Sequence, residues 1–273
     1  MFQTTARSPK GRSVLGLLEL IYHSIVRDMR KSHSNAFIGL LMAMSSAVIF
    51  VLAFYLMFTV LGLRNSAVRG DFMLYVMSGI FLFLTHTKAL GAVLGAEGPT
   101  SQMMKHAPMN TMIAIIAAAI SCLYIQTLSM VTIIFFYHSF FNPVEFADPV
   151  GAFGMYLMAW FTGCAVGLVF LAAKPWLPGL VTVLSSIYMR MNMIASGKMF
   201  LANTLPYYML KMFDWNPLFH AIDQARGFTF INYNPHFSSI SYPLYVGLAL
   251  VMIGLMGEFF TRQHASESWG AGK

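Results

Sequence analysis

The stretch Ala36–Leu63, AFIGLLMAMSSAVIFVLAFYLMFTVLGL, decides the fold, because it is apolar almost throughout and holds no charged side chain. A helix needs about 20 mostly apolar residues to cross the hydrocarbon core of a bilayer, and this stretch is longer than that. The strands of a membrane β-barrel would instead alternate in polarity. The stretch therefore predicts a membrane-spanning α-helix.

The composition of the whole chain agrees with this prediction. Of its 273 residues, 58% are hydrophobic and 10% charged, and the mean hydropathy is +0.66. Globular domains carry about 25% charged residues, so a soluble fold would lack the polar surface to cover its core. Both cysteines, Cys122 and Cys164, fall inside apolar runs, which favours a packing role. We predict an all-α, polytopic membrane protein.

Five further apolar stretches follow the first, which gives six predicted transmembrane helices. The six are Ala36–Leu63, Phe72–Leu94, Met109–Phe136, Val150–Ala173, Leu177–Ala195 and Ile240–Phe260. The predicted organisation is a transmembrane domain over residues 36–262, between a cytoplasmic N-terminal segment of residues 1–35 and a cytoplasmic tail of residues 263–273.

Lysines and arginines place both termini in the cytoplasm, because cytoplasmic loops of membrane proteins collect these residues. With that orientation the inner segments hold Arg7, Lys10, Arg12, Arg27, Arg30, Lys31, Lys88, Lys105, Lys174, Arg262 and Lys273. The outer segments hold only Arg64, Arg69, Lys211 and Arg226. The same bias accounts for the net charge of +7, so we expect no nucleic acid partner.

The stretch before the first span, Ser13–Lys31, is amphipathic. Its apolar residues recur at helical spacing, at Val14, Leu17, Leu18, Ile21, Ile25 and Met29. This pattern predicts a helix that lies in the membrane surface, with its cations near lipid headgroups. The alternative is a simple topology anchor.

Motifs for ATP hydrolysis and for common enzyme chemistry are missing from the sequence. It has no phosphate loop, no H-E-x-x-H or Cys/His metal cluster and no G-x-S-x-G nucleophile elbow. Gly197 and Lys198 form a Gly–Lys pair but lack the first glycine and the Ser/Thr of a phosphate loop. We therefore predict a non-enzyme chain that binds no cofactor itself.

Two glycine pairs have the G-x-x-x-G spacing that lets transmembrane helices approach closely. They are Gly91 with Gly95, in GAVLG, and Gly163 with Gly167, in GCAVG. Such pairs are common by chance in apolar helices.

The fifth predicted span carries Arg190 near its middle. A charge at that depth costs about 2.5–3.5 kcal/mol on insertion scales, so the side chain should face protein or water. Polar residues accompany it, and together they predict the wall of a polar translocation path: Tyr188, Arg190, Asn192, Ser196 and Lys198. The alternative is an internal ion pair or a bent helix that only packs.

The segment between the fifth and sixth spans is outside the membrane core by this topology, yet it is rich in aromatic residues. Aromatic rings anchor proteins at the interface, and they also stack on sugar faces. Within it, NPLFHAIDQAR, residues 216–226, predicts a short helix with Asn216 as N-cap and Pro217 as first residue. We expect Asp223 and Arg226 to pair on its water-facing side.

These features together resemble the membrane subunit of ABC-2-type exporters, and most closely the permeases for capsular polysaccharide and O-antigen. The resemblance covers nearly the whole chain. Its sharpest matches are Ser196–Gly197, Pro206, the N-P-L…R pattern of residues 216–226, and VRDMRKSHSNAFIG, residues 26–39, at the start of the first span.

The resemblance implies six transmembrane helices, an interfacial N-terminal helix and a re-entrant outer segment. It also implies a bacterial inner-membrane location, a second permease copy, and a partner ATPase subunit that binds ATP and Mg. This ATPase would dock on the cytoplasmic loop at Glu97, Gly98, Lys105 and His106. The outer gate would comprise Tyr207, Trp215, Asn216, Pro217, Asp223 and Arg226.

The substrate that the resemblance implies is a surface polysaccharide of capsule or O-antigen type, linked to a lipid. Two alternatives stay open. One is an ABC-2 exporter of a lipid or small amphiphile, with the same fold and a narrower channel. The other is a membrane-embedded enzyme or assembly scaffold.

Overall fold

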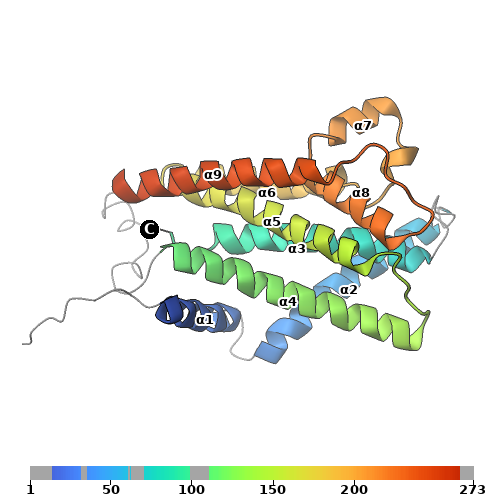
Figure 1. Ribbon diagram of the computed structural model, residues 1–273, viewed down its shortest axis with the longest axis horizontal. Coiled ribbons are helices and arrows are strands. Elements are labelled where there is room, and N and C mark those ends of the chain that lie inside the picture. Colours follow the sequence, from blue (N-terminus) through green and yellow to red (C-terminus); the bar gives the residue numbers. More distant parts are fainter. Residues whose placement is uncertain (1–13, 32–35, 61, 63–70, 99–110, 265–273) are drawn as a thin grey trace, which may run out of the picture.

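A computed structural model of the chain describes residues 14–31, 36–60, 62, 71–98 and 111–264, and their regular structure is entirely helical. Most of the helices run side by side along the long axis of the molecule (Figure 1). In chain order they are α1 (Val14–Lys31), α2 (Ala36–Val60), α3 (Phe72–Leu94), α4 (Thr111–Phe140), α5 (Pro149–Ala173), α6 (Pro178–Ala195), the 3₁₀ turn η2 (Ala202–Thr204), α7 (Tyr207–Phe213), α8 (Pro217–Thr229) and α9 (Ser241–His264).

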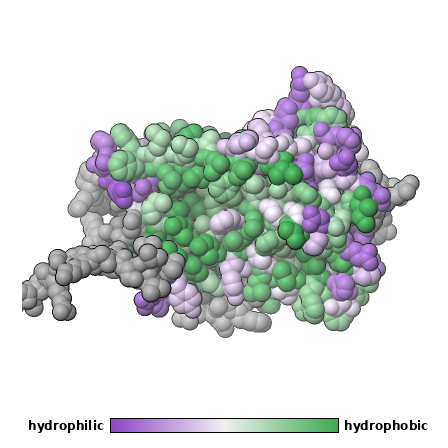
Figure 2. Space-filling model, in the orientation of Figure 1, coloured by the Kyte–Doolittle hydropathy of each residue, from purple (hydrophilic) through white to green (hydrophobic). Residues whose placement is uncertain are grey.

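Five of these helices, α2, α3, α4, α5 and α9, are long and apolar enough to cross a membrane. Hydrophobic side chains cover the middle of the face shown in Figure 2, and hydrophilic ones gather mainly toward the two ends. The six-span prediction is therefore supported for five helices. The helix in place of the predicted fifth span, α6, is less apolar because it carries Ser185, Ser186, Arg190 and Asn192.

The two ends of the bundle differ. The C-terminal ends of α3 and α9 and the start of α4 lie at one end, with α1 nearby, whereas α7, α8 and the α4–α5 connection lie at the other (Figure 1). The amphipathic stretch before the first span is confirmed as a helix, α1, which packs against α4. Residues 1–13 and 265–273, which include most of the predicted tail, lie outside the described residues.

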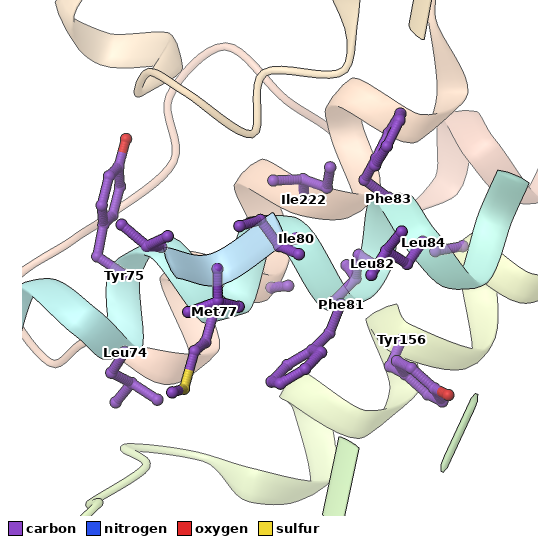
Figure 3. Close-up of a cluster of buried hydrophobic side chains, with 14 of the residues drawn as sticks. Leu74, Tyr75, Met77, Ile80, Phe81, Leu82, Phe83, Leu84, Tyr156 and Ile222 are labelled. Atoms are coloured by element: carbon purple, nitrogen blue, oxygen red, sulfur yellow. The ribbon is translucent and has the colours of Figure 1, made fainter. Parts of the chain in front are cut away.

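Helix α3 forms the centre of the bundle, with α2, α4, α5 and α8 packed around it. It begins at Asp71, whose Oδ1 accepts a hydrogen bond from the Met73 amide at 2.9 Å. The Tyr137 hydroxyl of α4 donates to Oδ2 of the same carboxylate at 2.5 Å. The side chains of α3 project in opposite directions. Figure 3 shows Leu74, Met77 and Phe81 on one side of the helix, and Tyr75 and Phe83 on the other.

Close packing of α3 on α5 depends on the second glycine pair. A Cβ on Gly163 would meet the backbone carbonyl oxygen of His86, and one on Gly167 would lie 2.7 Å from the Leu90 carbonyl oxygen. The G-x-x-x-G spacing in GCAVG therefore lies at a close helix contact. The first pair makes no such contact, because a Cβ on Gly91 would meet no atom within 4 Å.

We expect Gly163→Ala to destabilise the bundle, because the obstructing atoms belong to the α3 backbone and cannot rotate away. Overpacking of a core costs about 1–3 kcal/mol, so the melting temperature of the detergent-purified protein should fall. Gly154→Ala is the matched control on the same helix, since a Cβ there meets nothing within 4 Å. Equal melting temperatures for the two variants would contradict the close α3–α5 contact.

Candidate functional site

Helix α6 ends in a sharp reversal of the chain. Ser196 is its C-cap, and Gly197 follows with a φ of 74°, a left-handed conformation that favours glycine. A Cβ on Gly197 would also lie 2.7 Å from Cδ2 of Phe219 in α8. The reversal leads through η2 and α7 into α8, which lies against α3 and α5.

Asn216 joins the start of α8 to the end of α6. Its Oδ1 accepts a hydrogen bond from the Leu218 amide at 3.1 Å, so the predicted N-cap is confirmed. Its Nδ2 donates to Oδ1 of Asn192 at 2.8 Å and to the Ala195 carbonyl at 3.0 Å. One buried amide thus caps one helix and binds a carbonyl left free at the end of another.

Arg226 occupies the space between α8, α3 and the reversal, and is 0% exposed. Its guanidinium donates to the backbone carbonyls of Gly197 at 2.8 Å, Lys198 at 2.6 Å and Phe200 at 2.7 Å. The same group lies 4.3 Å from the centre of the Tyr75 ring. One cation therefore supplies the donors that three buried carbonyls of an irregular segment require.

Asp223, one turn earlier on α8, is 2% exposed, and its hydrogen-bond partners differ from those of Arg226. Its carboxylate accepts hydrogen bonds from the Tyr233 hydroxyl at 2.5 Å, the Ser238 hydroxyl at 2.7 Å and the Ala202 amide at 3.3 Å. Burial, and then the charge of Asp223, raise the pKa of Tyr233. Asp223 thus holds η2 and the connection from α8 to α9.

The prediction that Asp223 and Arg226 form a water-facing pair is wrong. Both side chains are buried, and no ion pair joins them within the described residues. The physical reason is that α3, α5 and the 230–240 connection cover α8, so its polar groups must bond inside the protein. His220 follows the same rule, since it bonds to the Asp214 carbonyl at 2.6 Å and accepts from the Ser239 amide at 3.0 Å.

Lys198 is the second buried cation of the reversal, and is 2% exposed. Its Nζ lies 3.4 Å from the centre of the Phe83 ring and 4.9 Å from that of Phe54, with Phe50 at 5.7 Å. Among the described residues it finds no hydrogen-bond acceptor, and the Ser196 hydroxyl is likewise without a partner. Cation–π attraction to α2 and α3 is the interaction left to the ammonium.

The predicted path residues lie on two sides of α6. Asn192, Ser196 and Lys198 are buried against the bundle, and Tyr188 is half-buried. Arg190 is exposed in the single chain, beside the exposed apolar side chains of Ile187, Met191 and Ile194.

His86 was not among the predicted site residues, although it links three helices. Its Nδ1 lies 3.1 Å from the Ala159 carbonyl of α5, and its Nε2 lies 3.1 Å from the Tyr188 hydroxyl of α6. Because a carbonyl only accepts, Nδ1 carries the proton and Nε2 accepts from Tyr188. A polar cluster within an apolar span, Thr85–Lys88, was the signal in the sequence. Here its histidine joins α3 to α5 and α6.

The other predicted gate and docking residues take separate places. Tyr207 and Trp215 are exposed on the α7 side, where α7 stands away from the bundle (Figure 1), and Pro217 is buried at the start of α8. Glu97 and Gly98 follow the C-terminal end of α3, at the opposite end of the molecule. Lys105 and His106 lie outside the described residues. No group of metal-ligating side chains forms within the part of the chain described.

Comparisons with known proteins do not add to this geometry. No model of a protein family matches the sequence, and a search of curated proteins gives no significant match.

We expect Arg226→Lys to destabilise the protein although it keeps the charge, because an ammonium cannot reproduce the planar guanidinium fork. A buried carbonyl left without a donor costs about 1–3 kcal/mol, so the melting temperature in detergent should drop. Proteolysis between residues 198 and 206 should also accelerate. Arg262→Lys makes the same chemical change at an exposed arginine in the last turn of α9 and should leave both readouts unchanged. An Arg226→Lys variant with the melting temperature of the wild type would contradict the role assigned to the planar guanidinium.

Proposed function

We propose that this chain is the membrane subunit of an ABC-2-type exporter that moves a surface polysaccharide, of capsule or O-antigen type and linked to a lipid, across the bacterial inner membrane. In this proposal six helices cross the membrane, with α6 as the fifth, and both termini are cytoplasmic. The apolar helices of the bundle are compatible with a multi-pass membrane protein.

One observation carries the proposal: two of the motifs on which the family resemblance rests, Ser196–Gly197 and the N-P-L…R pattern of residues 216–226, meet in one buried cluster. Ser196 and Gly197 form the reversal after α6, Asn216 binds the end of α6, and Arg226 binds the carbonyl of Gly197. The two motifs belong to different helices, α6 and α8, and the contacts of Asn216 and Arg226 bring them together. In this proposal the cluster forms the base of a re-entrant outer segment that acts as the export gate.

The exposed face of α6 supports a second copy of the chain as a partner. Arg190 lies there among apolar side chains, and an arginine facing lipid is costly. A second copy that covers this face would shield Arg190 and enclose a path between the two subunits. In the proposal Arg190 and Tyr188 line that path, and the aromatic residues of α7 lie at its outer mouth.

ATP hydrolysis belongs to a separate subunit in this proposal, because the sequence carries no phosphate loop. The docking surface would lie at the end of the bundle where α3 finishes, around Glu97 and Gly98. The same end holds the C-terminus of α9 (Figure 1), which suits a large cytoplasmic partner.

Co-purification tests this proposal. An ATPase subunit with a phosphate loop should co-purify with the tagged wild-type chain in mild detergent, and Glu97→Lys should reduce its recovery because the charge is reversed at the docking surface. Glu145→Lys reverses an exposed charge at the opposite end of the bundle and should leave recovery unchanged. Absence of any such ATPase from the wild-type preparation would contradict the proposed function. Equal recovery from both variants would contradict only the docking surface.

A further inference from the structure

A cavity of about 390 Å³ lies between α3, α4, α5 and α8, apart from the cluster around Arg226. Its floor includes Leu74, Met77 and Phe81, all buried, and these project from the same side of α3 in Figure 3. Met130 and Ile134 of α4 and Tyr156 of α5 line its walls. The volume lies within the range of small-molecule sites, about 300–1,000 Å³.

The cavity offers almost nothing to water. The hydroxyls in its lining already bond to the protein: Ser78 donates to the Tyr75 carbonyl at 2.8 Å, Thr229 donates to the Ala225 carbonyl at 2.7 Å, and the Tyr156 hydroxyl lies 3.2 Å from that of Thr127. A buried water needs two to four polar partners, and apolar cavities stay dry. The guest that fits is therefore apolar.

The mouth of the cavity opens between two helices that are long and apolar enough to cross a membrane. Val131 and Phe135 of α4 and Phe153 of α5 line it and are exposed. The central helix α3 is visible between α4 and α5 in Figure 1. In a bilayer, the medium at such a mouth is lipid hydrocarbon.

One end of the cavity is polar. His138, in the last turn of α4, belongs to the lining and is exposed. Its Nδ1 accepts a hydrogen bond from the Val144 amide at 2.9 Å, which leaves Nε2 with the ring proton as a donor. The cavity thus combines an apolar floor with a single donor near the α4–α5 connection, where the bundle ends. This polarity matches a lipid whose chain enters the protein while its headgroup stays at the membrane surface.

We propose that the cavity binds one acyl chain of a bilayer phospholipid, from the leaflet at the α7–α8 end of the bundle, with the phosphate near His138. A flexible hydrocarbon chain can reach the buried floor, which the rigid surface of another protein could only cover. Lipid binding in this cavity does not depend on the exported substrate, so its test is independent of the proposed function.

Photolabelling of the purified protein tests this site. The probe is a phosphatidylethanolamine with a diazirine near the end of one acyl chain, in nanodiscs of phosphatidylethanolamine and phosphatidylglycerol. The labelled residues are then mapped by mass spectrometry. We expect label on Met77, Phe81 or Tyr156, which are buried and out of reach of lipids that only surround the protein. Label confined to exposed residues such as Val131 and Phe153 would overturn the proposal.

A cavity-filling variant supplies the second test. Ala152→Phe places a ring in the lining from α5 and should abolish label on the buried floor. Val150→Phe adds the same ring on α5 at a position that is 80% exposed and outside the lining, so floor labelling should persist. Unchanged floor labelling in Ala152→Phe would overturn the proposal. If that variant fails to fold, the position of the wild-type label decides.

Discussion

The burial of the Arg226 guanidinium is the constraint on which the segment between α6 and α9 depends. An uncompensated charge in an apolar interior is strongly unfavourable, and the carbonyls of Gly197, Lys198 and Phe200 supply acceptors for this one. The cation in turn binds these carbonyls together in an irregular segment. The arrangement needs a glycine at 197 for the reversal and a glycine at 79, where a Cβ would lie 2.8 Å from the guanidinium.

The contacts of Arg226 hold α8 within the bundle, against α3 and α5. Asn216 fixes its start to the end of α6, and Asp223 fixes the connection that covers it. The segment from the end of α6 to α8 is thus continuous with the core around α3.

Much of this architecture could be predicted from sequence alone. Long apolar runs predicted five helices that are long and apolar enough to cross a membrane, and Asn216–Pro217 predicted the start of α8. Local patterns encode these features. The G-x-x-x-G spacing alone did not predict the close helix contact, because Gly163 and Gly167 make one and Gly91 does not. The burial of Asp223 and Arg226 could not be predicted in this way, because it depends on residues 230–240 folding over α8. The links from His86 to Tyr188 and from Lys198 to Phe83 join distant helices, and no local pattern marks them.

The central claim is that this chain exports a lipid-linked polysaccharide, and depletion of the chain tests it most directly. The measurement is the location of the polymer in depleted cells, by immunogold labelling of sections and by extraction of lipid-linked glycans. Our account predicts loss of surface polymer and accumulation of lipid-linked polymer on the cytoplasmic side of the inner membrane. Unchanged surface polymer, with no cytoplasmic accumulation, would contradict it.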